Sequence, residues 1–173
     1  MPATDPLRGL LDAAAEGDDT ALGELVRRTQ PAVWRLCALL GSDGNEEDLV
    51  QETYLRAMRS LGSFRGDAPV QSWLLAIARH TCADDVRARE RQRRLARRLS
   101  RERHDPGPAS TSTEALVADL EPDRRDAFVL TQLLGLSYEE AGAALGCPTG
   151  TIRSRVARAR ADLLDMVRRA EAL

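Results

Sequence analysis

SYEEAGAALGCPTGTIRSRVARARADL, residues 137–163, joins two stretches of helical periodicity through a short turn. The first stretch, 137–144, opens with the pattern S-x-x-E, which is typical of a helix N-terminus. Gly146 lies in the turn, where it supplies a backbone conformation that residues with a Cβ atom resist. The second helix is predicted over 149–170. The segment therefore predicts a helix-turn-helix, a unit that places its second helix in the DNA major groove.

An αα-hairpin within a helical bundle would contain the same two helices, so the faces of the second helix have to separate the two interpretations. At about 100° per residue, one stripe is apolar and forms the predicted core face: Ile152, Val156, Ala159, Leu163 and Val167. The opposite face consists of small residues and one arginine: Ser154, Ala157, Arg158 and Ala161. Small side chains let a helix approach base edges, where an arginine donates two hydrogen bonds to guanine. This pattern favours DNA reading over a simple bundle.

The arginines of this helix are predicted to have different roles. Ser154 and Arg158 are candidate readers of base edges, because they lie on the small-residue face. Arg153 and Arg155 flank that face, where DNA phosphates would lie. Arg160 borders the core stripe and is predicted to pack or to form a salt bridge within the protein.

Helical periodicity also dominates the rest of the chain, and no strand pattern extends over more than a few residues. The predicted helices are 7–16, 20–40 with a bend or break at Pro31, 46–61, 73–100, 114–121 and 122–135. Residues 62–72 are predicted to form a loop because Gly, Pro, Asp and Ser are frequent there. Residues 104–113 are rich in Pro, Gly, Ser and Thr and lack an apolar anchor. We therefore predict an all-α chain with two small helical domains, 1–100 and 114–173, joined by a flexible linker, 101–113.

Charge is distributed unevenly, although the formal net charge is only −2. Residues 1–52 contain eleven acidic residues and four arginines, whereas residues 86–104 contain nine arginines and two glutamates. The basic run has two interpretations, neutralisation of DNA phosphates or a solvated helix end. Phe64 and Trp73 lie on either side of the predicted loop and are candidates for stacking on unpaired bases, and a place in the core is the alternative for Trp73.

Helix 46–61 presents a polar face that includes one leucine: Asp48, Gln51, Glu52, Leu55 and Arg56. An exposed leucine among charged side chains is typical of a protein-binding surface. A solvated helix is the simpler alternative, and the residues alone do not separate the two.

The sequence lacks the motifs of the common enzyme classes, so we predict a protein without catalytic residues. It has no P-loop, no HExxH and no Gly-x-Ser-x-Gly motif. Cys37, Cys82 and Cys147 fit no metal-ligand spacing and are predicted to be free thiols in a reducing compartment. We expect no cofactor and no metal. Without a signal peptide or an apolar run of membrane-spanning length, the chain is predicted to be cytoplasmic and not inserted in a membrane.

Three segments together resemble the extracytoplasmic-function (ECF, group IV) sigma factors of bacterial RNA polymerase, in the sigma-70 family. They are EEDLVQETYLRA, SFRGDAPVQSWLLAIARHTCADDVR and LLGLSYEEAGAALGCPTGTIRSRVARARADL. The resemblance covers roughly residues 15–100 and 114–167, with the segments in the family's order. It implies sigma region 2 in residues 1–100 and sigma region 4 in residues 114–173. It also implies a protein that binds core RNA polymerase, reads the −10 and −35 promoter elements and opens the DNA.

The resemblance assigns roles to three groups of residues. The polar face of helix 46–61 matches the surface that grips the clamp coiled coil of core polymerase: Asp48, Gln51, Glu52, Leu55 and Arg56. The pocket for a flipped −10 base and the strand-opening helix correspond to Phe64, Arg65, Ser72, Trp73, Arg79, His80 and Arg87. The −35 reading helix corresponds to Thr149, Thr151, Arg153, Ser154, Arg155 and Arg158. His80 departs from the asparagine that many members have there, which leaves the −10 base preference open.

The implied partners are core RNA polymerase, contacted at its clamp coiled coil and its flap, and promoter DNA. Many members of the family are held by an anti-sigma factor that clamps both regions, and the resemblance extends to such a partner. One alternative is a stand-alone helix-turn-helix regulator, which would bind duplex DNA by itself as a dimer. Another is a protein-interaction module, whose function would not depend on Arg158.

Overall fold

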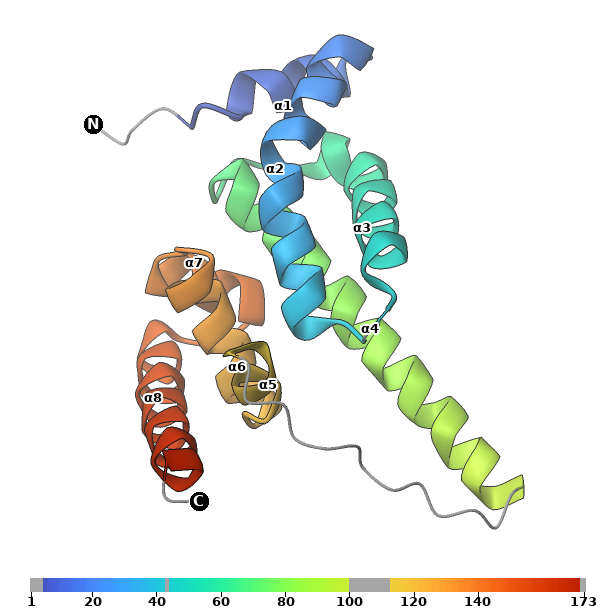
Figure 1. Ribbon diagram of the computed structural model, residues 1–173. Coiled ribbons are helices and arrows are strands. Elements are labelled where there is room, and N and C mark those ends of the chain that lie inside the picture. The colour runs from blue at the N-terminus through green and yellow to red at the C-terminus, as the bar shows by residue number, and fades with distance from the viewer. Residues whose placement is uncertain (1–4, 43, 100–112, 172–173) are drawn as a thin grey trace.

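The computed structural model describes residues 5–42, 44–99 and 113–171, and in these ranges it contains helices and turns (Figure 1). The N-terminal half has the elements α1 (Arg8–Ala15), α2 (Asp19–Leu40), α3 (Glu46–Ser60), η1 (Leu61–Ser63) and α4 (Val70–Leu99). The C-terminal half has α5 (Thr113–Ala118), α6 (Pro122–Phe128), η2 (Val129–Leu133), α7 (Tyr138–Leu145) and α8 (Thr149–Glu171). The predicted all-α class is confirmed. The predicted linker lies outside the described residues, apart from Thr113.

Within the described ranges, no helix combines the length and the apolar character that a membrane span requires.

Helix α4 begins at Val70, so the prediction that residues 62–72 form a loop is wrong at its end. The reason is a cap from a distant part of the chain. The backbone N–H of Val70 donates to Asp5 Oδ2 at 2.6 Å, and the same carboxylate accepts from the N–H of Leu7 at 3.0 Å. A carboxylate that satisfies a free N–H of a first turn stabilises the helix start. Ser72 consequently lies in the first turn of α4, where it is buried.

Helix α2 continues through Pro31, where the sequence predicted a bend or break. Proline removes one backbone hydrogen bond, to the carbonyl four residues earlier. Pro31 itself is exposed, while Thr29 and Val33 on either side are buried. Packing of this buried face against α1, α3 and α4 keeps the helix continuous.

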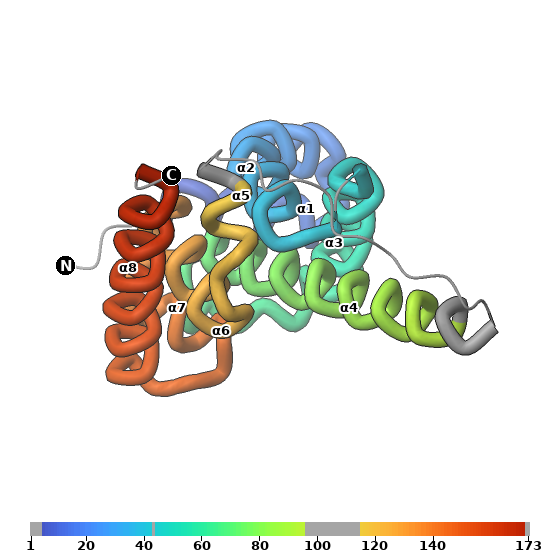
Figure 2. Tube along the Cα trace, turned by 60° about the horizontal axis from the view of Figure 1, so that its bottom comes forward, coloured from blue at the N-terminus to red at the C-terminus, as the bar shows by residue number. Residues whose placement is uncertain are grey.

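The two halves of the chain share one hydrophobic core. Five of its largest fully buried side chains come from five different elements: Leu36, Leu75, Val117, Leu130 and Ile152. Helix α7 packs against the first part of α4, while the second part of α4 projects away from the body of the protein (Figures 1 and 2). The predicted DNA-binding helix and the predicted strand-opening helix are therefore held in one packed arrangement.

The helix-turn-helix has the predicted caps. Ser137 Oγ accepts from the backbone N–H of Glu140 at 3.1 Å, and the Glu140 carboxylate accepts from the backbone N–H of Ser137 at 2.7 Å. Gly146 ends α7 in the left-handed conformation, with φ at 64°. Both predictions are confirmed. The structure adds Gly142, at which a Cβ atom would lie 2.8 Å from the carbonyl oxygen of Cys147.

Replacing Gly142 with alanine should lower the free energy of unfolding by about 1–2 kcal/mol, because the overpacking outweighs the gain in helix propensity. The obstacle is a backbone oxygen, which cannot swing aside as a side chain could. Gly150 is the matched control: it lies in the next helix, and a Cβ there meets nothing within 4 Å. Urea unfolding of G142A, G150A and the unsubstituted protein measures both effects. Equal midpoints for G142A and the unsubstituted protein would contradict the expectation.

Candidate nucleic-acid and protein interfaces

The small-residue face of α8 is open to solvent, as the sequence predicted. Ser154, Ala157, Arg158 and Ala161 are all exposed, while Ile152, Val156 and Ala159 on the other side are buried. Ser154 Oγ donates to the carbonyl of Thr151 at 2.9 Å, so the hydroxyl oxygen keeps its lone pairs for accepting a hydrogen bond. Among the described residues, neither Arg153 nor Arg158 has an acidic partner. Two uncommitted guanidinium groups therefore border a face on which base edges could approach closely.

Arg155 differs from its neighbours on α8. Its guanidinium forms an ion pair with Asp123 of α6 and lies 3.6 Å from the sulfur of Cys147. Its side chain is only 23% exposed. The Arg155 guanidinium already has a charged partner within the protein, and its contact with phosphate stays a prediction. Arg160 Nη2 donates a hydrogen bond to the side-chain oxygen of Gln132 on η2, in keeping with the structural role that the sequence indicated.

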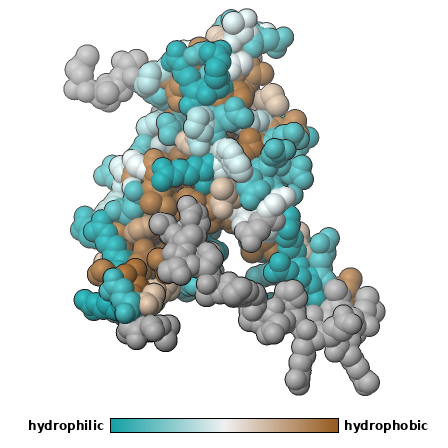
Figure 3. Space-filling model, viewed as in Figure 1, coloured by the Kyte–Doolittle hydropathy of each residue, from teal (hydrophilic) through white to brown (hydrophobic). Residues whose placement is uncertain are grey.

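The apolar stripe of α8 is buried only in the first half of the helix. Leu163 is half-buried, and Val167 is 38% exposed, so the prediction that the core face extends this far is wrong. Helices α6 and α7 cover the beginning of α8, and Leu164 (58% exposed) is another uncovered apolar side chain near its end. Figure 3 shows apolar surface at the lower left, where α8 ends in Figure 1.

A cavity of about 230 Å³ lies at the start of α4. Four residues predicted to bind the −10 element line it: Phe64, Arg65, Ser72 and Trp73. The rings of Phe64 and Trp73 pack at a centroid distance of 5.1 Å with a tilt of 51°. Trp73 borders a hydrophobic cluster and also presents a surface to the cavity. The two aromatic rings in the lining are side chains on which an unpaired base could stack.

The opposite wall of this cavity belongs to α7, which the sequence did not indicate. Glu140, Ala143 and Ala144 line it there. Ser72 Oγ donates to Glu140 Oε1 at 2.7 Å. Burial by itself raises the pKa of Glu140, but hydrogen bonds from Ser72 and Ser137 outweigh it and hold the pKa below its ordinary value. Glu140 therefore caps its own helix and also binds a residue of the predicted −10 surface.

Arg79 makes a second contact between the two halves. Its Nε and Nη2 atoms lie 2.8 and 2.7 Å from Asp126 Oδ2 on α6. The side chains of Arg79 and Asp126 are only 23% and 14% exposed. In this arrangement, two residues predicted to bind the −10 element, Ser72 and Arg79, are bound instead by carboxylates of the C-terminal half. Because these contacts are distant in sequence, no local pattern could have revealed them.

His80 lies outside the cavity, although the resemblance placed it in the lining of the base pocket. Its side chain is exposed, and its Nδ1 atom lies 2.7 Å from the carbonyl oxygen of Ala76. Ala76 lines the cavity, one helical turn earlier. In the packed arrangement, His80 therefore does not bear on the shape of this cavity.

The predicted protein-binding face of α3 is exposed and partly apolar. Asp48, Gln51 and Leu55 are exposed, and Leu55 retains 44% of its surface. Met58, at helical spacing from Leu55, is 40% exposed and extends the apolar part of this face. An exposed Leu–Met pair among carboxylates gives a partner both apolar and charged points of contact.

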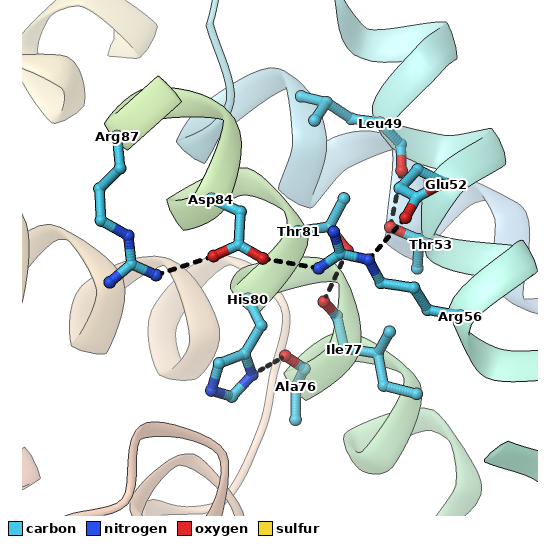
Figure 4. Close-up of polar contacts among 10 residues, drawn as sticks. All are labelled: Leu49, Glu52, Thr53, Arg56, Ala76, Ile77, His80, Thr81, Asp84 and Arg87. Carbon is cyan, nitrogen blue, oxygen red and sulfur yellow. Dashed lines mark hydrogen bonds and ion pairs between the residues drawn. The ribbon is translucent and has the colours of Figure 1, made fainter. Parts of the chain in front are cut away.

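Arg56 of this face forms an ion pair with Asp84 of α4 and also binds Glu52 within α3 (Figure 4). Arg56 Nε donates to Glu52 Oε1 at 2.7 Å, and Arg56 Nη1 donates to Asp84 Oδ2 at 2.8 Å. The other oxygen of Asp84 accepts from Arg87 Nη2 at 3.0 Å. Hydrogen bonds to Glu52 and Asp84 raise the pKa of Arg56, and the hydrogen bond from Arg56 lowers the pKa of Asp84. Each of these two shifts favours the charged form of its group.

The described residues contain no cluster of three His, Cys, Asp or Glu side chains that could hold a metal ion. Their cysteines are free, with Cys37 and Cys82 buried and Cys147 half-buried.

Two family models match the chain. Sigma-70 region 2 matches residues 25–92, and Sigma-70, region 4 matches residues 111–163. The chain is 47% identical over 159 residues to the ECF RNA polymerase sigma factor SigC of Mycobacterium tuberculosis, covering 88% of this chain and 86% of that protein. It is 35% identical over 169 residues to the ECF RNA polymerase sigma-E factor of Escherichia coli, covering 87% and 88%.

Solved structures agree with this assignment. CnrH, solved in complex with the cytosolic domain of CnrY, matches with a TM-score of 0.73 and 30% identity over 92% of this chain and 96% of CnrH. The sigma factor RpoE of Bartonella quintana, solved with the anti-sigma factor NepR, matches with a TM-score of 0.71 and 29% identity, covering 85% and 96%. The chain therefore belongs to the ECF group of the sigma-70 family of RNA polymerase sigma factors.

Proposed function

We propose that this chain binds core RNA polymerase and directs it to promoters by reading a −35 element with α8 and a −10 element with the start of α4. In this proposal residues 1–100 are sigma region 2, residues 114–173 are sigma region 4, and residues 101–113 connect them. The extent of the two family matches supports this division. The protein acts where the polymerase acts, in the cytoplasm, and contributes binding energy rather than a catalytic group.

One observation supports this proposal above the others: a single chain combines an exposed small-residue helix face with a cavity that has two aromatic rings in its lining. Arg158, between the exposed Ala157 and Ala161, suits a base edge in the major groove. Phe64 and Trp73 suit an unpaired base. A stand-alone duplex-binding regulator has no need of the second feature, whereas promoter opening needs both. Unstacking costs a few kcal/mol per base, which contacts in such a cavity offset.

For core polymerase, the proposal assigns the α3 face: Asp48, Gln51, Glu52, Leu55 and Arg56. Met58 joins this set because it is exposed beside Leu55. The uncovered apolar end of α8, with Leu164 and Val167, supports a second contact, which we assign to the flap. The Bartonella relative was solved with an anti-sigma factor, which supports a partner of that kind for this chain as well.

Run-off transcription tests the function directly. Purified protein and bacterial core RNA polymerase are mixed with genomic promoter fragments, and transcript starts are mapped. We expect transcripts with defined starts only when both proteins are present. Duplex binding by the protein alone is measured in parallel by mobility shift. Specific duplex binding without core polymerase, together with no promoter-dependent transcript, would instead establish the stand-alone regulator.

A further inference from the structure

One carboxylate, that of Asp84, is shared by two guanidinium groups with different predicted roles (Figure 4). Asp84 Oδ2 accepts from Arg56 of the α3 face at 2.8 Å, and Asp84 Oδ1 accepts from Arg87 at 3.0 Å. Arg56 in turn divides its donors between Asp84 and Glu52. The result is a row of alternating charges, Glu52–Arg56–Asp84–Arg87, which runs from the proposed polymerase-binding face of α3 to the predicted strand-opening helix α4.

We propose that Asp84 is a positioning residue that couples the binding of core polymerase on α3 to the binding of DNA phosphate by Arg87. This inference rests on the proposed function, which assigns Glu52 and Arg56 to core polymerase, and on the family resemblance, which assigns Arg87 to the strand-opening helix. Asp84 belongs to neither surface in the sequence analysis. Its role follows from the two hydrogen bonds that it accepts on its two oxygens.

The charges around the row fix the direction of the coupling. The first turn of α3 is acidic, with Glu46, Glu47 and Asp48, so this face attracts a cationic partner surface. A cation that pairs with Glu52 withdraws it from Arg56. Arg56 then directs its N–H donors to Asp84. Because Asp84 now accepts more from Arg56, its hydrogen bond from Arg87 weakens, and Arg87 is freed to bind phosphate. Polymerase binding and phosphate binding therefore favour each other, and the coupling is reciprocal.

The neighbouring Asp85 has no such connection. Its carboxylate accepts from Asn45 at 3.1 Å and lies 3.3 Å from Arg89 Nε. Neither Asn45 nor Arg89 belongs to the predicted polymerase-binding set. Adjacent carboxylates on one helix are thus directed to different partners, and Asp84 is the one in contact with that set.

The test is the affinity of the full-length protein for core polymerase in the absence of DNA, measured by fluorescence anisotropy competition. In Arg87→Gln, Asp84 loses one of its two arginine partners and binds Arg56 more strongly, so Arg56 binds Glu52 less. Glu52 is then available to core polymerase, and we expect the affinity to increase about two- to fivefold. In Asp84→Asn, Arg56 loses its ion pair with Asp84 and binds Glu52 more strongly, so Glu52 is less available. We expect the affinity for core polymerase to decrease by a similar factor. The double variant should behave like D84N alone. All the shifts should shrink in high salt.

The opposite signs separate this role from a structural one, because loss of an ion pair that only supports the fold would shift both single variants in the same direction. Glu24 and Arg27 on α2 are the control, because they pair at the same i,i+3 spacing and Glu24 also accepts from a second arginine, Arg28, outside both assigned surfaces. E24Q and R27Q should leave the affinity unchanged. Shifts of the same sign in D84N and R87Q, no shift in R87Q, or a shift in R87Q that persists in the D84N background would overturn the coupling. No binding of core polymerase by the unsubstituted protein would overturn the proposed function itself.

Discussion

Replacing Arg158 with alanine should reduce transcription from promoters that depend on the −35 element by about tenfold to a hundredfold, because a bidentate arginine–guanine contact contributes about 1–3 kcal/mol of discrimination. The Arg158 side chain is exposed and has no acidic partner among the described residues. The alanines on either side, Ala157 and Ala161, cannot replace its donors. The expected loss therefore concerns recognition and leaves the fold intact.

The sharpest measurement is the base preference at each −35 position, obtained by run-off transcription from a set of single-base promoter variants. R158A should lose the preference at one position and retain it at the others. Arg169→Ala is the matched control, because Arg169 is an exposed arginine on the last turn of the same helix, about three turns beyond Arg158. Full retention of every base preference by R158A would refute the assignment of Arg158 as a reader and would favour the interaction-module alternative.

The helix-turn-helix could be predicted from the sequence because its determinants are local. Ser137 and Glu140 cap α7 within one turn, and Gly146 ends it in the left-handed conformation that a β-carbon disfavours. The buried and exposed sides of α8 follow from helical spacing in its first half, where α6 and α7 cover it. In its second half the same spacing misled, because amphipathicity shows which side is apolar but not whether a neighbouring helix covers it.

The parts that sequence reasoning missed depend on contacts between distant residues. The start of α4 is capped by Asp5, which no pattern near Val70 could indicate. In the sequence, Arg153 and Arg155 each lie between Ser154 and one β-branched apolar residue, yet only Arg155 forms an ion pair with Asp123 of α6. Charge and spacing identified the arginines of α8 as a group, and only the packing of α6 separated their roles.

Asp126→Asn should increase the affinity of the free protein for single-stranded −10 DNA by about tenfold, because a hydrogen bond to a charged group contributes on the order of 1.5 kcal/mol. In the packed arrangement, Asp126 binds Arg79, and Glu140 binds Ser72 at the wall of the cavity. DNA that uses Arg79 and Ser72 needs the two halves to separate. Molecules whose two halves are in contact cannot bind this DNA, so they lower the apparent affinity. Loss of the Asp126 carboxylate raises the fraction of molecules whose halves have separated and can bind.

Asp126 is a cleaner position for this test than Glu140, whose carboxylate also caps α7. Because D126N removes a negative charge, which by itself favours DNA binding, Asp165→Asn is the control that removes the same charge from an exposed site on α8. Anisotropy titration of a labelled −10 strand measures affinity, and small-angle X-ray scattering measures the radius of gyration. D126N should raise both relative to D165N. An equal gain in affinity for the two variants at unchanged radius of gyration would show that charge alone acts, and that the Arg79–Asp126 contact does not restrain the −10 surface.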